Sequence, residues 1–357
     1  MNLYDIILQS ASSALELQRD DGSMPPGWNG PYHQQETPVR NTAHWLITFL
    51  KAYEITEDRK YKDAAKKCVE YLLSNEARPM NATFWHRKAE KKDKCNGLIG
   101  QAWTIEALSI AEEKLGLKEC KEIAEEIFFL HPFNEKCGLW KRVDIDGKIL
   151  DFDYVFNHQL WFAASASMIE NREIDDSINV FMDKLTENMR TDETGLIHHF
   201  LLPDCNTKTK IYSFLINVYL LKKGKKFNQI LQEGYQAFNF YALALLKKKF
   251  PFHSFWDTNL FTSSLNHITL QSYYKYLENN RYGSPYNPAG FENAFAIHVF
   301  SDKFEESESL ISEWASWQIK KHFDFEEKMM KKNTEDPVTL SARIYEATRL
   351  PDIPIKI

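Results

Sequence analysis

Residues 96–103, with the sequence NGLIGQAW, begin a segment in which apolar residues recur at helical spacing. Four other helix-like segments begin in the same way, with amide, histidine and aromatic side chains close together: VRNTAHW (39–45), FNHQLW (156–161), YQAFN (235–239) and FENAF (291–295). If these beginnings converge in space, they form a cup lined with planar rings and amide groups. Such a surface suits sugars, because C–H faces stack on rings while hydroxyls need donors and acceptors.

A second set of helical segments alternates with these, so that successive segments pair as hairpins. We expect the pairs 41–55 with 59–75, 97–115 with 118–130, 157–170 with 173–189, 233–248 with 258–279, and 291–300 with 302–322. Residues 339–350 would form a sixth inner helix, with residues 2–18 as its outer partner. The segment from Thr207 to Lys226 is interpreted as an inserted helix. This repeat predicts an all-α fold, an (α/α)6 toroid of helical hairpins, with residues 1–357 as a single domain.

The connections between the hairpins carry their own pattern. Residues 82–87, 137–142 and 194–199 alternate apolar and polar side chains, which predicts short strands over one face of the toroid. Residues 144–147, with the sequence DIDG, are typical of a hairpin turn. Residues 22–37 are rich in Pro, Gly and Asn and predict a long ordered loop.

Composition excludes several classes of protein. The 357 residues are 43% hydrophobic and carry a net charge of −6 without a basic stripe, which argues against nucleic-acid binding. No signal peptide or spanning apolar run is present, so we predict a cytoplasmic protein without a membrane span. The five cysteines are odd in number, widely spaced and without a C-x-x-C pair, which predicts free thiols in a reducing compartment.

Known motifs for metals and cofactors are missing from the sequence. It has no H-E-x-x-H, no EF-hand loop, no P-loop and no G-x-G-x-x-G. We therefore predict no metal and no cofactor.

Candidate catalytic residues cluster at one inner-helix start. Asp151 and Asp153 precede His158, and glycoside hydrolysis needs one protonated carboxyl group and one ionised partner. A histidine at this place could act as acid or base near neutral pH. The alternative for both aspartates is a structural role as caps of the following helix.

The candidate substrate-binding residues are of three kinds. Rings on loops could stack on a sugar, guanidinium groups match a carboxylate in bidentate geometry, and amides or other polar groups could fix hydroxyls. These residues are Trp28, Arg40, His44, Trp85, Arg87, Asn96, Gln101, Asn157, Gln159, His199 and Glu292. Each arginine could instead form a structural ion pair, and each histidine could be a hydrogen-bonded structural group.

The alternation of inner and outer helices, with aromatic and polar inner starts, resembles the six-hairpin toroid superfamily. That group includes N-acylglucosamine 2-epimerases, the helical domain of glucuronyl C5-epimerases and unsaturated glucuronyl hydrolases. Residues 96–102 look like the corresponding inner helix of C5-epimerase-like domains. Residues 21–25 (DGSMP) and 37–42 (TPVRNT) are similar to polysaccharide-biosynthesis proteins of the VpsJ kind. The resemblance implies the toroid fold, but fold alone does not decide the chemistry.

These observations predict a carbohydrate-active protein of cell-envelope polysaccharide metabolism. Its partner would be a sugar or oligosaccharide, possibly acidic, and its chemistry would be acid/base: glycoside hydrolysis or sugar epimerisation. One alternative is a non-catalytic glycan-binding or assembly protein with the same cup. Another is a helical scaffold whose cup is filled by its own side chains.

Overall fold

Six inner elements form a closed ring in the computed structural model, which describes residues 1–357. They are α2 (Val39–Thr56), α4 (Gly97–Leu115), α6 (Phe156–Ala166), α10 (Lys225–Lys249), α13 (Ala289–Val299) and α15 (Pro337–Ala342) with its 3-10 continuation η4 (Arg343–Arg349). Each packs against the next along the chain, and α15 with η4 packs back on α2. The predicted toroid is confirmed.

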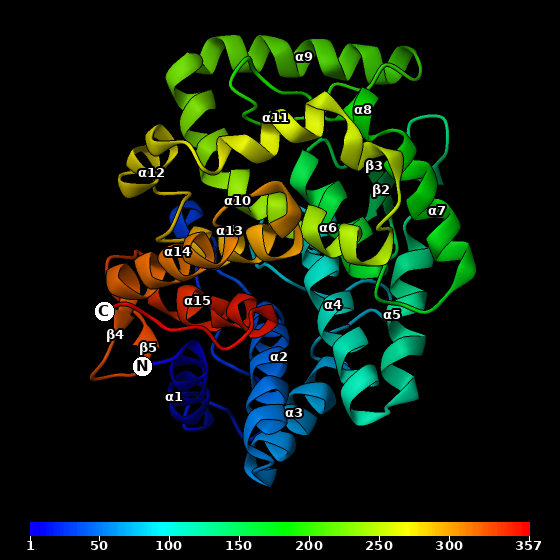
Figure 1. Ribbon diagram of the computed structural model, residues 1–357. Helices are drawn as coiled ribbons and strands as arrows, with labels where there is room; N and C mark the ends of the chain where they lie inside the picture. The colour runs from blue at the N-terminus through cyan, green and yellow to red at the C-terminus, as the bar shows by residue number, and fades with distance from the viewer.

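The outer elements cover this ring, as Figure 1 shows for most of them. They are α3 (Arg59–Leu72), α5 (Lys118–Leu130), α7 (Arg172–Asp183), α8 (Leu185–Asn188), α11 (Asn259–His267), α12 (Gln271–Glu278) and α14 (Ser307–His322). The N-terminal helix α1 (Leu3–Leu15) packs against α2 and η4, so it is the outer partner of the last inner element, as predicted. The amide of Tyr4 donates to Asp352 at 3.0 Å, which joins the two ends of the chain.

Inner and outer helices differ in burial, as their sequence patterns predict. Outer helix α3 buries one face, including Tyr61, Ala65 and Cys68, and its charged residues face solvent. Asp58 caps it by accepting a hydrogen bond from the amide of Lys60 at 3.1 Å. Inner helix α4 is buried on all sides in its first three turns, because neighbours surround it.

Several helical segments depart from the predicted boundaries; for example, α10 begins at Lys225 rather than at residue 233. The segment 258–279 is interrupted: a 3-10 turn η2 (Ser254–Asp257) precedes α11, which Thr258 caps, and extended backbone at Leu270 separates α11 from α12. The segment 339–350 tightens into 3-10 helix after Ala342. The inserted helix α9 (Thr207–Lys223) is present and ends at Gly224, whose φ of 84° favours glycine.

The strands are fewer than predicted. β1 (Phe133–Asn134), β2 (Leu139–Val143) and β3 (Ile149–Phe152) form an antiparallel sheet with its turn at 144–147, and β4 (Phe323–Asp324) pairs with β5 (Met329–Met330). The strands expected at 82–87 and 194–199 were wrong, since only isolated bridges occur there. Glutamine side chains form hydrogen bonds with backbone groups of these segments: Gln101 with the amide and carbonyl of Phe84, and Gln236 with the amide of Ile197.

Two of the five cysteines form a disulfide, which corrects the prediction of free thiols. Cys137, next to β2, is bonded to Cys205, just before α9, with 5.5 Å between the Cα atoms. Cys68, Cys95 and Cys120 are free and buried. No helix combines the length and apolar content needed to cross a bilayer.

Candidate functional site

A cavity of about 320 Å³ lies at the N-terminal ends of the inner helices. Every side of the ring contributes to its lining, directly or through the loop that precedes an inner helix. Representative contributors, in chain order, are Tyr32, Trp103, His158, Tyr235, Tyr286 and Arg343. The inner-helix starts therefore do converge around one cup.

Asp153 and His158 form the titratable pair of the cup. Oδ2 of Asp153 lies 2.8 Å from Nδ1 of His158 and accepts a hydrogen bond from the amide of Leu98 at 3.0 Å. Oδ1 accepts from the amide of Val155 at 3.2 Å. Asp153 is buried, whereas the His158 side chain is 25% exposed and lines the cavity. The carboxylate therefore holds the imidazole by one nitrogen and leaves Nε2 free for a ligand.

The charge state of this pair follows from its surroundings. Burial alone would raise the pKa of Asp153, but His158, Arg142 and the amide of Leu98 together lower it to about 2. Asp153 is therefore ionised at neutral pH. An ionised carboxylate on Nδ1 fixes the tautomer in which Nε2 is the proton acceptor, and it stabilises the imidazolium that forms when Nε2 takes a proton.

Asp151, the other predicted catalytic carboxylate, does not lie in the cup. Its Oδ2 is 2.9 Å from the amine of Lys208 on α9, whose own side chain is exposed. Residues i and i+2 share one side only within a strand, and β3 ends at Phe152. Asp153 lies beyond this end, so it contacts His158 while Asp151 reaches Lys208 on α9.

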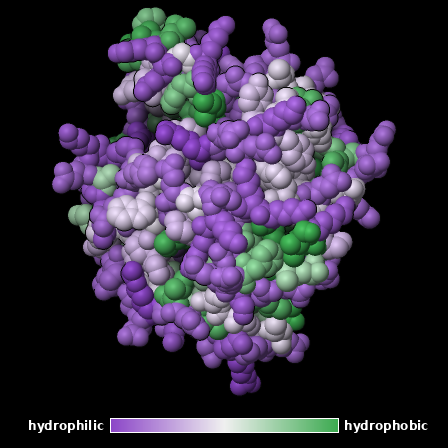
Figure 2. All heavy atoms as spheres, turned by 90° about the vertical axis from the view of Figure 1, so that its left-hand side faces the viewer, coloured by the Kyte–Doolittle hydropathy of each residue, from purple (hydrophilic) through white to green (hydrophobic).

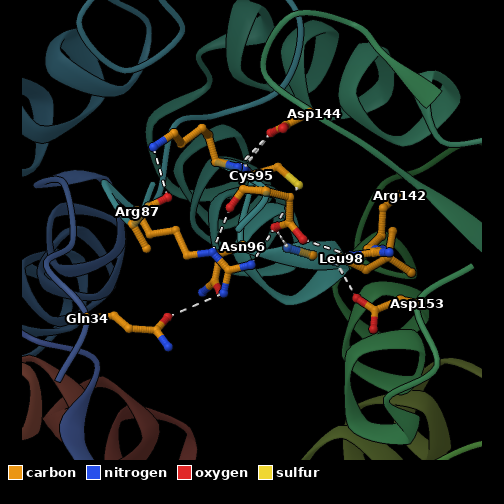
Figure 3. A network of polar contacts seen from close by, with 12 residues as sticks. Gln34, Arg87, Cys95, Asn96, Leu98, Arg142, Asp144 and Asp153 are labelled. Atoms are coloured by element: carbon orange, nitrogen blue, oxygen red, sulfur yellow. Dashed lines mark hydrogen bonds and ion pairs between the residues drawn. The ribbon is translucent and has the colours of Figure 1, made fainter. Parts of the chain in front are cut away.

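Arg87 and Arg142 belong to a network of polar contacts beside the cup, which Figure 3 shows. Arg87 donates to Oδ1 of Asn96 at 3.0 Å and to Oδ1 of Asp93 at 2.7 Å, and Arg142 donates to the other oxygen of Asp93 at 2.8 Å. Lys92 also lines the cavity, where burial and the charge of Arg87 lower its pKa. Arg87 and Asn96, both predicted as ligands, thus face the cavity together.

Another part of the lining is rich in tyrosine. The hydroxyls of Tyr32 and Tyr235 are 2.7 Å apart, and the ring of Tyr282 lies 5.6 Å from that of Tyr32. Tyr286 donates to Oδ1 of Asn29 at 2.7 Å. Burial raises the pKa of Tyr32 and Tyr235, so both hydroxyls keep their protons at neutral pH.

Sequence reasoning missed this tyrosine cluster, although a signal was present. Residues 281–287, with the sequence RYGSPYN, precede the inner helix α13 in the same way that the predicted loops precede other inner helices. The rings therefore occupy the position in the repeat where a ligand-facing loop was expected.

Asn157 and His199 lie together in the cup. Nδ2 of Asn157 is 3.4 Å from Nδ1 of His199, and both side chains line the cavity. Burial and the neighbouring His158 lower the pKa of His199 to about 3, so its imidazole is neutral. These two predicted ligands can exchange hydrogen bonds with a bound hydroxyl.

Three predicted ligands are buried beneath the cup rather than in its lining. Arg40 pairs with Glu36 at 3.2 Å and places its guanidinium 4.0 Å from the centre of the Trp103 ring. His44 stacks on Tyr345 with 4.3 Å between ring centres, and burial and Arg40 hold its pKa well below the usual value. Glu292 accepts a hydrogen bond from Arg343 at 2.8 Å and has no exposed surface.

Gln101 and Gln159 bind backbone, not ligand. Gln159 accepts from the amide of Trp140 at 2.9 Å, donates to its carbonyl at 2.8 Å and donates to the carbonyl of Asp153 at 3.0 Å. Gln101 makes the equivalent pair of bonds to Phe84. Each amide therefore fastens the preceding connection onto its inner helix, and no free group is left for a sugar hydroxyl.

The two predicted stacking tryptophans lie outside the cavity lining. Trp28 is 54% exposed on the loop before α2. Trp85 is half-buried, and its indole nitrogen donates to the carbonyl of Arg87 at 2.9 Å. No three His, Cys, Asp or Glu side chains come together as a group that could hold a metal ion.

Comparison with known proteins identifies one extensive sequence similarity. No protein-family model matches the chain. Over 370 aligned residues it is 42% identical to archaeal glycosylation protein Q of Haloferax volcanii, with 99% of both chains covered.

Solved structures share the fold at much lower identity. Cellobiose 2-epimerase from Bacillus thermoamylovorans matches with a TM-score of 0.64 and 11% identity over 94% of both chains. An unsaturated glucuronyl hydrolase specific for heparin matches with a TM-score of 0.63 and 10% identity over 97% of this chain and 94% of the other. An α-1,6-mannanase of Salegentibacter matches with a TM-score of 0.58 and 10% identity over 97% and 98%. These similarities show a common toroid.

Proposed function

The chain belongs to the family of archaeal glycosylation protein Q, and we propose that it is an enzyme that moves a proton on a sugar bound in the cup. The family membership supports the carbohydrate-active function predicted from the sequence. The observation that carries the proposal is the hydrogen bond between Asp153 and His158, which leaves one imidazole nitrogen free in the cavity.

In this mechanism His158 is the general base and acid. Its Nε2 takes a proton from a carbon next to a sugar carbonyl or carboxylate, which leaves an enediolate. In an isomerisation the imidazolium returns the proton to the neighbouring carbon. In an epimerisation the same carbon receives a proton on its other face, from water or a second donor, and His158 then releases the proton that it holds. Asp153 is a positioning residue that stabilises the imidazolium in between. Of the hydroxyls of Tyr32 and Tyr235, which keep their protons, one donates to the other, and the second would donate a hydrogen bond to developing negative charge.

The positions of the carboxyl groups favour epimerisation or isomerisation over hydrolysis. The usual hydrolytic mechanisms need two carboxyl groups roughly 5–10 Å apart on either side of the glycosidic bond. Glu36 is bound to Arg40, and Glu292 is bound to Arg343, both without exposed surface. Asp153 is already engaged by His158, so a pair of free carboxyl groups does not face the cavity.

The charge of the cup favours an acidic sugar. Arg87 and Lys92 line the cavity, and a uronate carboxylate is the sugar substituent that a guanidinium group binds best. The same cations would stabilise the enediolate formed by proton abstraction. The tyrosine rings of the same cavity offer faces for stacking.

The predicted cytoplasmic location stays a prediction. It was based on the amino-terminal sequence and on five free thiols. The disulfide between Cys137 and Cys205 removes the second of these grounds, because reducing compartments disfavour such bonds.

The test measures proton exchange, which can be detected whichever product is formed. The protein is incubated in deuterated water with hexoses, hexuronic acids, N-acetylhexosamines and their oligosaccharides, and loss of a carbon-bound proton is followed by NMR. We expect exchange with an acidic sugar, and we expect His158→Gln to abolish it in a protein that remains folded, as melting curves show.

His33→Gln is the matched control, because His33 is an exposed histidine paired with Glu335 outside the cavity lining. It should exchange like the wild type. Release of reducing ends without exchange would favour hydrolysis instead. A thermal shift with a sugar that shows neither reaction would favour the glycan-binding alternative.

A further inference from the structure

The inserted helix α9 exposes an unbroken apolar stripe. Ile211, Phe214, Leu215, Val218 and Leu221 are 56%, 66%, 54%, 46% and 82% exposed, respectively. Their spacing of three or four residues places them on one face of the helix. Contiguous apolar surface of this kind marks an interaction site in a soluble protein.

A neighbouring face of α9 is attached to the toroid. Tyr212 stacks on Tyr154 with 5.1 Å between ring centres, and Tyr219 packs edge-on near Phe200. The disulfide of Cys205 fixes the chain just before the helix begins. In Figure 1 α9 is the outermost helix at the top of the molecule. The exposed fractions of the stripe residues show that they face solvent.

The segment around α9 is strongly basic in an acidic protein. The residues from Cys205 to Gln232 include six lysines and no Asp or Glu, although the whole chain has a net charge of −6. Four of these lysines form no ion pair: Lys222 and Lys223 at the end of α9, and Lys225 and Lys226 at the start of α10. In Figure 2 hydrophobic side chains bordered by hydrophilic ones lie at the top, where Figure 1 places α9.

We propose that α9 binds in the plane of an anionic lipid surface. Its apolar stripe would enter the boundary between headgroups and acyl chains, and its lysines would contact anionic headgroups. A helix of 17 residues with lysines near both ends lies on a bilayer rather than across it.

A second copy of the chain fits this surface less well. In a two-fold interface the same patch meets itself, so the lysines of one α9 would face a helix that carries no acidic residue. Anionic headgroups supply the missing negative charge.

Lipid binding would also set the orientation of the cup. Tyr219 of α9 and Phe227 at the start of α10 line the cavity. Binding through α9 would therefore hold the cavity beside the lipid surface. The binding itself does not depend on the chemistry proposed for His158.

The test is flotation of the whole protein with vesicles. One set contains phosphatidylglycerol and phosphatidylcholine in equal parts, and the other contains phosphatidylcholine alone. We expect binding to the anionic vesicles that weakens as salt is added, and little binding to the neutral ones.

Two variants separate the apolar and charged contributions to vesicle binding. The apolar variant carries Phe214→Gln and Leu221→Gln. The charge variant carries glutamine in place of Lys222, Lys223, Lys225 and Lys226. Each should reduce binding about tenfold or more. Phe252→Gln is the apolar control, because Phe252 is 96% exposed in the loop after α10. Lys66→Gln with Lys67→Gln, on the solvent side of α3, is the charge control.

Melting curves check that each variant is folded. Leu215→Trp gives an independent measure of binding, because the tryptophan fluorescence should shift to the blue when α9 enters anionic vesicles. Equal flotation of all variants, or none by the wild type, would overturn the proposal. A dimer in light scattering that Phe214→Gln disrupts, without vesicle binding, would show instead that α9 joins two copies.

Discussion

The carboxylate oxygen Oδ2 of Asp153 lies 2.8 Å from Nδ1 of His158 and also accepts the amide of Leu98. One oxygen atom therefore joins the starts of two neighbouring inner helices, α4 and α6. The same contact orients the imidazole whose other side faces the cavity. Asp153 therefore contributes both to helix packing in the toroid and to the orientation of His158 in the cup. Variants of Asp153 and of the residues around it should show which of them affect stability and which affect activity.

Asp153→Asn should lose activity and stability together. An amide cannot stabilise an imidazolium on His158, so proton exchange should fall by several orders of magnitude. The free energy of unfolding should drop by roughly 1–3 kcal/mol at neutral pH, because the pKa of Asp153 is lowered to about 2 in the folded protein.

The pH dependence of that loss has a defined sign. A carboxyl group whose pKa is lowered on folding stabilises the protein above its unfolded pKa of about 3.9, and this contribution disappears as the pH falls through about 2. Chemical denaturation at neutral and acidic pH should therefore show the wild type and Asp153→Asn converging in acid. A constant difference would contradict the assigned charge state.

Gly97→Ala should damage the same contact from the other side. Gly97 has a φ of +62°, and a Cβ atom there would lie 2.4 Å from Oδ2 of Asp153. The expected cost is about 2 kcal/mol or more, with loss of exchange activity. Gly116→Ala is the control: its φ is +70° but nothing lies within 4 Å, so it reports the backbone strain alone. Equal melting temperatures for the two variants would rule out the clash.

Gln159→Ala should destabilise the protein without touching the cavity. The substitution leaves the amide and carbonyl of Trp140 and the carbonyl of Asp153 without their buried partner. A loss of about 2–4 kcal/mol is expected in urea unfolding. Gln271→Ala, at an exposed position in α12, should change stability little. If Gln159→Ala instead weakened sugar binding with normal stability, the ligand role expected from the sequence would stand.

Arg343→Met should leave two buried carboxyl groups without their cation. Arg343 contacts Glu292 at 2.8 Å and Glu346 at 2.5 Å, and all three side chains are buried. Removal of one partner of such a cluster costs about 3–5 kcal/mol. Burial raises the pKa of both glutamates, and loss of the cation raises it further. The loss of stability should therefore be larger at neutral pH, where the unfolded chain has ionised carboxylates, than in acid, where both states are protonated. Glu292→Gln keeps the shape of the side chain and should lower the free energy of unfolding much less.

The sequence by itself determined the helices and their order in the ring. The predicted bounds 97–115 and 118–130 agree with α4 and α5, because apolar periodicity and the glycine after Leu115 are local signals. The toroid followed from the repeat of these local patterns, and so did the pairing of α1 with the last inner element. The assignment of residues 1–357 to one domain stays a prediction.

Only the tertiary structure decided which side chains reach the cup. Asn96 and Gln101 belong to the same short motif, yet one faces the cavity and the other holds the backbone of Phe84. Tyr32 and Tyr235 meet across 203 positions of sequence. The direction of a side chain at a helix start depends on the loops that pack over it, and those loops come from distant parts of the chain. Periodicity describes a face of one helix, whereas a cavity is the space that several elements leave between them.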